Sequence, residues 1–361
     1  MSPSTVTSSS SVTSPSSVTS PSTTIRVGIL GASGYTGAEL LRLVAQHPNF
    51  ELAVATGDSQ AGVRAASLYP SLAVKYPDLV FEEFDPAKAE GLDVVFLGLP
   101  HEASMALAPQ LLGKVGCIVD LSAAYRLKDA SLYSQWYHFT HDQPEILAQT
   151  VYGLPELHRD ELKGAALVAT PGCHVTAATL ALAPLVRAGL LATTGVVVNS
   201  VTGVSGAGRG LKHSSLFCTV DEDVTAYGLL DHRHTPEIEQ EVGAQVLFTP
   251  HLAPMNRGIL ATCYGRPAAD VSTELLLATL KEFYAGEPFV TVGEASPSTK
   301  ATMGSNAAHL TARFDERTGT VMAICAIDNL AKGASGGAVQ AANVALGLPE
   351  TAGLTAVGLY P

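Results

Sequence analysis

Apolar and polar positions alternate in blocks over the first half of the chain. An apolar run at residues 25–30 (IRVGIL) is followed by a glycine-rich turn and a helical pattern at residues 38–48, which Pro48 ends. Further apolar runs, separated by stretches able to form helices, occupy residues 51–56, 93–99, 117–122 and 166–170. This alternation predicts an α/β fold with a parallel sheet covered by helices on both faces. We expect residues 25–170 to form a doubly wound, Rossmann-type domain.

The pattern changes after residue 171. One helical stretch is followed by strand-like runs, several without a long helix between them, at residues 196–203, 245–252, 258–265, 309–316 and 320–328. Consecutive strands predict an antiparallel sheet in an α+β domain, which we place at residues 171–330. Residues 331–361 begin with a glycine-led helical pattern (KGASGGAVQAANVAL). We expect this helix to return to the first domain, so that the two domains close a cleft.

Residues 1–24 have a different composition. They repeat an S-V-T-S-P-S theme and contain no charged side chain and no apolar stretch. Such a segment cannot bury enough surface to order itself, so we expect a disordered tail. A phosphorylated or targeting tail is the alternative, although the basic start of a secretory signal and the arginines of a transit peptide are missing.

Length, charge and cysteine usage narrow the function classes. The 361 residues suffice for two domains, and 47% hydrophobic against 15% charged residues indicates a folded body. A net charge of −12 argues against a nucleic-acid or anionic-membrane partner, and no apolar run is long enough to span a bilayer. Five scattered cysteines without a C-x-x-C pair are typical of a reducing compartment, so we expect a cytoplasmic protein.

The glycine-rich turn GILGASGYTGAEL lies between a strand and a helix. Glycine lets the backbone approach a pyrophosphate, whose charge the free N–H groups and dipole of a helix start stabilise. The context predicts dinucleotide binding, and a purely structural tight turn is the alternative. The candidate cofactor contacts in this turn are Gly31, Ser33, Gly34, Tyr35, Thr36 and Gly37.

The second strand ends at Thr56 without the terminal acid that would hold the ribose hydroxyls of NAD. Thr56, Ser59 and Arg64 could instead surround a 2′-phosphate, which favours NADP(H) as the cofactor. Asp58 lies close by and would repel that phosphate if it pointed inward.

Cys173 stands where a helix is expected to begin. In the segment PGCHVTAATLALAPLVRAG, Pro171 and Gly172 block backward extension of the helix. A helix start stabilises a thiolate, so we expect a lowered pKa and a nucleophile at Cys173, with a buried structural thiol as the alternative. Three of the remaining cysteines, Cys117, Cys263 and Cys325, lie in strand patterns, and Cys218 lies in an ambiguous segment.

The motif HRHTPEI supplies a candidate acid/base. His232 and His234 flank Arg233 just before a helix start, and a loop histidine beside a thiol can transfer protons at neutral pH. Glu237 could orient this loop. Metal binding, with Cys173 or His174 recruited, and a merely structural loop are the alternatives; without a third spaced ligand we expect no metal.

Positive charge for an anionic substrate is available locally. The stretch GVSGAGRG can wrap an anion through its N–H groups and Arg209. The other candidates, each of which could equally be a surface cation, are Arg126, Lys212, Arg233 and Arg257.

Together these segments resemble the N-acetyl-γ-glutamyl-phosphate reductases of arginine biosynthesis, which make N-acetylglutamate semialdehyde. The resemblance runs from about residue 25 to the C-terminus. It rests on GASGYTGAEL, FLGLPH, DLSAAYRL, YGLPEL, TPGCHVTAA, SGAGR, HRHTPEI, RGILAT, GSNAAH and DNLAKGASGGAVQAAN. The chain departs from the family pattern at His174, which is often Tyr, at SAAYRL in place of SADFRL, and at GGAVQAAN in place of GQAVQNMN.

The resemblance implies a Rossmann domain joined to a substrate and dimerisation domain like those of glyceraldehyde-phosphate and aspartate-semialdehyde dehydrogenases, in a homodimer or homotetramer. It assigns the nucleophile to Cys173 and the acid/base to His232. It adds cofactor contacts at Leu99, Pro100, Ser122, Gly206 and Asn329, and substrate contacts at Arg126, Ser205, Arg209, Arg233 and His234.

The implied reaction is NADPH-dependent reduction of N-acetyl-γ-glutamyl phosphate, with release of phosphate, through a thioester on Cys173. Another acyl-phosphate reductase, of the aspartate-semialdehyde dehydrogenase kind, is the nearer alternative. A non-catalytic module that senses NADP is the alternative from a different class.

Overall fold

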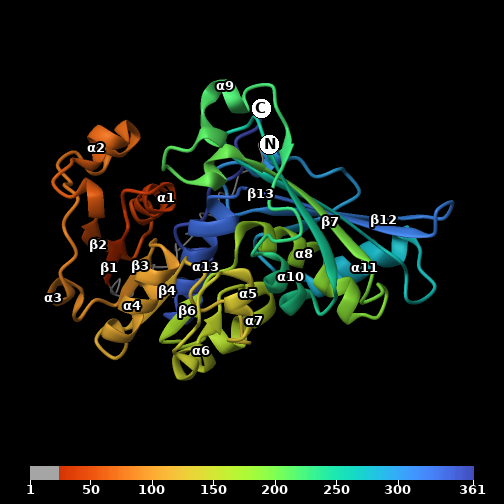
Figure 1. Cartoon of the computed structure of the whole chain (residues 1–361), viewed down its shortest axis with the longest axis horizontal. Coiled ribbons are helices and arrows are strands. Elements are labelled where there is room, and N and C mark those ends of the chain that lie inside the picture. Colours follow the sequence, from red (N-terminus) through yellow and green to blue (C-terminus); the bar gives the residue numbers. More distant parts are fainter. Residues whose placement is uncertain (1–23) are drawn as a thin grey trace, which may run out of the picture.

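The computed structural model describes residues 24–361; residues 1–23, which hold nearly all of the predicted tail, lie outside the described residues. Two sheets make up the molecule, one at each side of Figure 1. Within residues 24–361, no helix is long and apolar enough to cross a membrane. The two sheets belong to two domains that meet along the start of helix α8 (Cys173–Arg187).

The first sheet is parallel, with strand order β2-β1-β3-β4-β6-β5. Its central strands are buried on both faces, as their continuous apolar runs predict. The strand bounds are β1 (Ile25–Leu30), β2 (Phe50–Thr56), β3 (Val94–Leu97), β4 (Cys117–Asp120), β5 (Val151–Tyr152) and β6 (Leu167–Ala169). Because the chain leaves β1 toward β2 and later continues on the other side at β3, the order reverses between β1 and β3. Ligands of such sheets bind at this reversal point.

Helices cover both faces of the parallel sheet. α1 (Tyr35–Val44) and α7 (Pro155–Leu162) contribute to the core on one face, and α4 (His101–Leu111), α5 (Leu132–Trp136) and α6 (Pro144–Gln149) to the core on the other. The shorter elements between the strands are η1 (Asp58–Gln60), α2 (Ala65–Leu68), η2 (Pro70–Val74) and α3 (Pro86–Ala89). The predicted Rossmann-type layering is confirmed.

The second sheet has seven strands in the order β11-β12-β13-β10-β7-β9-β8. Their bounds are β7 (Val196–Gly203), β8 (Thr225–Ala226), β9 (Val246–Ala253), β10 (Ile259–Gly265), β11 (Val290–Val292), β12 (Ala308–Asp315) and β13 (Thr320–Ile327). The α+β prediction is confirmed, but the sheet is mixed and not antiparallel, since β7 pairs with β9 and β11 with β12 in parallel. Helices α10 (Thr235–Val242) and α12 (Thr299–Thr302) lie in the crossover connections that parallel pairing requires.

One face of the second sheet packs on helices α8, α10 and α11 (Thr273–Phe283). Along β7 and β10 buried residues therefore alternate with less buried ones. Between β7 and α10 the chain forms an arm (residues 204–231), visible above the sheet in Figure 1, which contains η3 (Val204–Ala207), η4 (His213–Ser215), α9 (Phe217–Val220) and β8.

The C-terminal segment crosses back toward the parallel sheet. After β13 the chain makes a π-helical turn, η5 (Ala331–Ser335), and then α13 (Gly336–Ala345). Ala338, Val339, Ala341 and Ala342 of α13 belong to the same hydrophobic cluster as β1, β3 and α1. The turn η5 therefore connects the two domains directly behind the start of α8 (Figure 1).

Candidate active site

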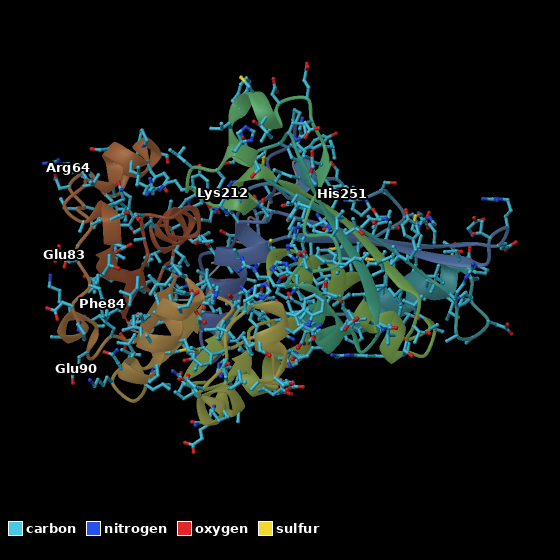
Figure 2. The ribbon with its side chains drawn as sticks, in the orientation of Figure 1. Arg64, Glu83, Phe84, Glu90, Lys212 and His251 are labelled. Atoms are coloured by element: carbon cyan, nitrogen blue, oxygen red, sulfur yellow. The ribbon has the colours of Figure 1, made fainter. Side chains whose placement is uncertain are left out.

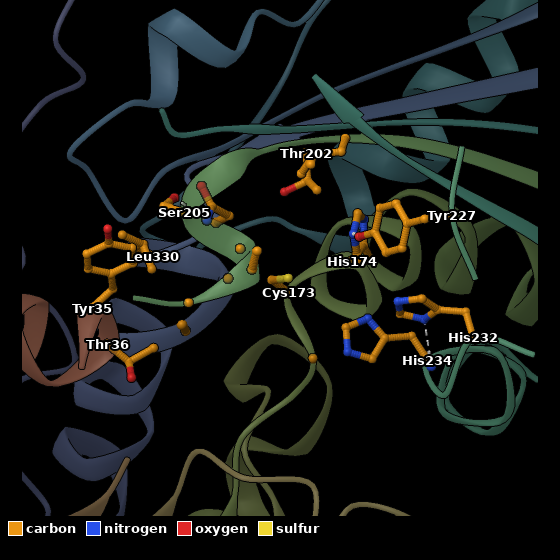
Figure 3. A pocket seen from close by; sticks show the side chains of 18 of the residues that line it. Tyr35, Thr36, Cys173, His174, Thr202, Ser205, Tyr227, His232, His234 and Leu330 are labelled. Atoms are coloured by element: carbon orange, nitrogen blue, oxygen red, sulfur yellow. Dashed lines mark hydrogen bonds between the residues drawn. The ribbon is translucent and has the colours of Figure 1, made fainter. Parts of the chain in front are cut away.

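A cavity of about 670 Å³ lies between the two domains. The starts of α1 and α8, the arm, the histidine loop (residues 232–234) and η5 form its walls (Figure 3). It brings together twelve of the predicted site residues: Gly34, Tyr35, Thr36, Arg126, Cys173, Ser205, Gly206, Arg209, His232, Arg233, His234 and Asn329. Segments separated by almost 300 residues thus face one space.

The glycine turn leaves room for a dinucleotide. Gly31 has φ +85°, and a Cβ there would lie 2.3 Å from the carbonyl oxygen of Gly98. At Gly37 a Cβ would lie 2.4 Å from the carbonyl oxygen of Gly31, so α1 packs closely on the turn. Gly34 precedes α1 without a side-chain cap, which leaves the first N–H groups of the helix available to an anion. These features fit the pyrophosphate of a dinucleotide at the reversal point of the sheet.

The other predicted cofactor residues do not line the cavity, and three of them brace the turns behind it. Ser33 donates to the carbonyl of Gly57, Thr56 accepts the N–H of Gly31 at 3.2 Å, and Ser122 donates to Asp120. Leu99 and Pro100 follow β3 at the same edge of the sheet, and Pro100 precedes α4.

Arg64 does not join the predicted 2′-phosphate site. Its guanidinium pairs with Asp78 at 3.0 Å at the outer edge of the first domain, whereas Lys212 lies on the arm (Figure 2). In this structure Arg64 and Thr56 both have partners, so the cofactor preference rests on the absence of an acid at the end of β2.

Cys173 is the first residue of α8 and keeps partial exposure to the cavity. Gly333 of η5 packs against it, where a Cβ would lie 3.0 Å from the Cβ of Cys173. Burial raises the pKa of the Cys173 thiol to about 11, and the charge of Arg126 and the N–H of His174 oppose this only in part. The predicted lowering of the pKa is therefore wrong, because desolvation outweighs the helix start.

Three imidazoles surround the thiol side of the cavity (Figure 3). Ring centroids lie 4.7 Å apart for His232 and His234, 5.7 Å for His174 and His234, and 6.0 Å for His174 and His232. Burial, assisted by Arg233, lowers the pKa of His232 to about 4, and burial holds the pKa of His234 well below its usual range. Both rings are therefore neutral at neutral pH.

The two histidines of the loop have different surroundings. His232 Nδ1 accepts the backbone N–H of His234 at 3.1 Å, which places the proton of neutral His232 on Nε2. The ring of His234 lies against Gly172, where a Cβ would be 2.4 Å from Nε2. Among residues 24–361, no three His, Cys, Asp or Glu side chains form a group that could hold a metal ion.

Glu237, at the start of α10, is fully buried. It accepts the N–H of Gly172 at 2.9 Å and the hydroxyl of Tyr152 at 2.7 Å, and it lies 3.6 Å from Arg126. These partners do not support the prediction that Glu237 orients the histidine loop. The carboxylate instead fixes the backbone just before Cys173 and holds Arg126 at the cavity wall.

Four of the five predicted cations line the cavity: Arg126, Arg209, Lys212 and Arg233. Arg257 does not, because it pairs with Glu39 at 2.7 Å and with Asp328 at 3.3 Å. The cavity thus carries the positive charge that an anionic substrate needs in a chain of net charge −12. Sequence reasoning missed two cavity residues with polar side chains close to Cys173, Thr202 and Tyr227, since neither lies in a motif.

A dinucleotide turn facing a helix-start cysteine across an interdomain cavity is the arrangement expected of a nicotinamide-dependent dehydrogenase. Two family models agree: "Semialdehyde dehydrogenase, NAD binding domain" matches residues 26–165, and "Semialdehyde dehydrogenase, dimerisation domain" matches residues 173–329.

Proteins with similar sequences show which group of semialdehyde dehydrogenases this chain belongs to. A protein of Symbiobacterium thermophilum is 49% identical over 348 residues, covering 94% of this chain and 100% of the relative. One from Geobacter sulfurreducens is 47% identical, with 93% and 100% covered. Both are named N-acetyl-gamma-glutamyl-phosphate reductase. The chain belongs to the N-acetyl-γ-glutamyl-phosphate reductase family within the semialdehyde dehydrogenases.

Solved structures with the same fold include two aspartate semialdehyde dehydrogenases. Enzyme II of Vibrio cholerae, complexed with ASA, has a TM-score of 0.68 at 16% identity, covering 90% of this chain and 98% of that chain. The Candida albicans enzyme with NADP has a TM-score of 0.67 at 16% identity, covering 89% and 98%. At this identity the likeness concerns the fold alone.

Proposed function

We propose that this chain catalyses the NADPH-dependent reduction of N-acetyl-γ-glutamyl phosphate to N-acetylglutamate 5-semialdehyde and phosphate, a step of arginine biosynthesis. One observation carries the proposal: Cys173 shares a cavity with the uncapped start of α1 and with four cationic side chains. The names of the relatives at 47–49% identity support the substrate. The substrate is a small anion, and phosphate is the leaving group.

In the first half-reaction the sulfur of Cys173 attacks the γ-carbonyl carbon, and the bond to phosphate breaks, which leaves a thioester. Because the thiol pKa is about 11 and the His232 pKa about 4, both groups are neutral at neutral pH and do not form an ion pair. The thiol proton goes to His232 as the carbon–sulfur bond forms; because Nε2 already carries a proton, Nδ1 takes it in exchange for the hydrogen bond from the His234 N–H. Backbone N–H groups at the start of α8 are placed to stabilise the oxyanion.

The second half-reaction reduces the thioester, and a nicotinamide cofactor held by the turn at residues 31–37 would supply the hydride. Cys173 then leaves the tetrahedral carbon, the aldehyde is released, and His232 returns the proton to the sulfur. Arg126, Arg209, Arg233, Ser205 and His234 bind the substrate and its phosphate.

The cofactor in this proposal is NADP(H). The supporting observation is that β2 ends at Thr56, whose hydroxyl accepts the N–H of Gly31, so that no carboxylate stands at the position that would hold the ribose hydroxyls. Residues Gly31 to Gly37 hold the pyrophosphate, and Gly206 and Asn329 lie at the opposite wall of the cavity.

We place a second copy of the chain on the open face of the mixed sheet. An apolar row runs across four neighbouring strands on the side away from α8, α10 and α11, in the order Leu247, Val197, Tyr264 and Met322. Leu247 and Tyr264 are 50% and 36% exposed. This surface supports a homodimer, or a homotetramer built from it, in the cytoplasm, where the unpaired cysteines stay reduced.

The decisive experiment is phosphate-dependent reduction of NADP with N-acetylglutamate semialdehyde. We expect activity with this substrate, much less with NAD in place of NADP, and little with aspartate semialdehyde. Preference for aspartate semialdehyde would favour the other acyl-phosphate reductase. Binding of NADP without any turnover would indicate a non-catalytic sensing module.

A second measurement tests the acid/base. His232→Asn should lower kcat and change the pH–rate profile while the protein keeps its melting temperature. His234→Asn is the matched variant, because the ring of His234 lies against Gly172 beside the thiol. A profile that changes only in His234→Asn would transfer the proton-transfer role to His234.

A further inference from the structure

His174 follows the thiol in sequence, and both of its ring nitrogens have partners. Nδ1 lies 2.7 Å from the hydroxyl of Ser200, on β7, and Nε2 lies 3.0 Å from the hydroxyl of Tyr227, which directly follows β8. Figure 3 shows the Tyr227 hydroxyl pointing toward His174 at the edge of the cavity that holds Cys173. His174 thus links a buried hydroxyl to one that faces the cavity.

The proton positions in this chain of three groups follow from the need to satisfy buried donors. Ser200 is 0% exposed, and within residues 24–361 its hydroxyl has one hydrogen-bond partner, His174 Nδ1. A buried O–H without an acceptor costs about 1–3 kcal/mol, so Ser200 donates and Nδ1 accepts. Burial, with His232 as the second cause, lowers the pKa of His174 to about 3, so the ring is neutral. Its single proton is on Nε2 and is donated to the Tyr227 oxygen.

This arrangement leaves Tyr227 with its own proton. Because its oxygen accepts from His174, the Tyr227 O–H is directed elsewhere, and no acceptor for it lies within residues 24–361. Burial raises the pKa of Tyr227, so the phenol stays protonated at neutral pH. The side chain lines the same cavity as Cys173, with its ring 5.5 Å from that of His232.

We propose that Tyr227 is a further catalytic residue, whose hydroxyl donates a hydrogen bond to an oxygen of the acyl substrate held at Cys173. Ser200 and His174 are positioning residues, since they fix which way the Tyr227 hydroxyl donates. The inference rests on the proposed function and adds to it a side-chain donor beside the start of α8, where Tyr227 contacts His174. It also gives His174 a role other than proton transfer.

Tyr227→Phe tests the donor. In the phosphate-dependent oxidation of N-acetylglutamate semialdehyde we expect kcat/KM to fall about 10²-fold, the effect of losing one preorganised donor. The affinity for NADP and the rate of Cys173 alkylation by iodoacetamide should not change, because neither needs the hydroxyl. Tyr360→Phe, at a tyrosine that is 69% exposed, is the matched control and should leave every quantity unchanged. Unchanged kcat/KM in Tyr227→Phe, or alkylation that falls together with turnover, would overturn the proposal.

The histidine tautomer gives a readout that does not need turnover. In protein labelled with ¹⁵N-histidine, we expect His174 to show a protonated Nε2 and an unprotonated Nδ1. Ser200→Ala should weaken this preference and lower kcat/KM less than Tyr227→Phe does. A protonated Nδ1 in the unsubstituted protein would overturn the inference. Failure of the proposed function can be told apart from failure of this inference. If the proposed function is wrong, the unsubstituted protein is inactive in the assay, and the protonation of His174 still tests the hydrogen-bond arrangement.

Discussion

The cofactor side and the thiol side of the cavity are built from different parts of the chain. On the cofactor side, one continuous segment from Gly28 to Gly37 supplies the turn. Its glycines leave space because they have no side chain, and the uncapped start of α1 leaves backbone N–H groups free. On the thiol side, Cys173 is surrounded by side chains from α8, β7, the arm and the histidine loop. Local sequence specifies the first side, and packing between distant segments specifies the second.

This difference changes what each side can tolerate. The glycine turn depends on space, so a single added methyl group tests it. The thiol side depends on burial, which lowers the pKa of the histidine rings and raises the pKa of the thiol, so that these groups are neutral at neutral pH. The segment from Asn329 to Ser335 joins the sides: Gly333 packs on Cys173, and Ser335 donates to the carbonyl of Thr36 at 2.8 Å.

The largest expected effect is on the thiol side. Cys173→Ser should lower kcat by about 10³-fold or more, because a hydroxyl in this setting does not form the covalent intermediate. NADP binding, measured by fluorescence titration, should be unchanged, since the glycine turn lies on the other side of the cavity. Substantial aldehyde formation by this variant would refute the nucleophile assignment.

The next largest effect is expected in the segment from Asn329 to Ser335, where a substitution should lower the stability of the protein. Lys332 of η5 is buried with Glu156 and hydrogen-bonds Gln340 at 2.6 Å. Lys332→Met leaves the Glu156 carboxylate buried without its partner and should lower the free energy of unfolding by about 3–5 kcal/mol in urea titration. The exposed pair of Lys163 and Asp160 offers the control, since Lys163→Met should cost at most about 1 kcal/mol. Equal losses in the two variants would contradict the structural role of the buried pair.

On the cofactor side, two glycines separate folding from binding. Gly31→Ala should destabilise the protein by about 1–3 kcal/mol, because φ is +85° and the added methyl would lie 2.3 Å from Gly98. Gly34→Ala should fold normally, since its nearest neighbour is 3.6 Å away, and should weaken NADP binding instead. Melting curves should show the larger loss of stability in Gly31→Ala, and NADP titrations should show weaker binding by the well-folded Gly34→Ala. If the two variants behaved alike in both assays, the two glycines would not have the separate roles proposed for them.

A last expected effect, which needs no substitution, is the pH response of the free thiol. Because the Cys173 pKa is about 11 and the thiolate reacts, alkylation by iodoacetamide should rise about tenfold for each pH unit between pH 7 and pH 10. Peptide mass spectrometry distinguishes Cys173 from the exposed Cys218. A plateau below pH 9 would show that the helix start and Arg126 outweigh burial.

Much of the fold could be predicted from periodicity, because a strand buried on both faces reads as a continuous apolar run. The parallel pairing of β7 with β9 could not, since the strands are 42 residues apart and the arm between them has no regular pattern. That pairing matters for the site, because β8 pairs with β9 at the sheet edge and Tyr227 directly follows β8.

Cys173 and the histidine loop were predictable because Pro, Gly and His stand in short, recognisable contexts. The pKa of Cys173 was predicted in the wrong direction because burial sums over several segments, whereas the helix start is local. Tyr227 and Lys332 were missed for the same reason. Their importance depends on Ser200, His174 and Glu156, which are 27 to 176 residues away and give no signal at the position itself.

The position of α13 in the core of the first domain also determines when that domain can be completed during synthesis. Residues 338–345 fill the cluster formed by β1, β3 and α1. They leave the ribosome only after the entire second domain has been made. Until then the face of the parallel sheet that α1 and α7 also cover lacks part of its cover, so the nascent first domain exposes apolar surface and depends on the last part of the chain to close it.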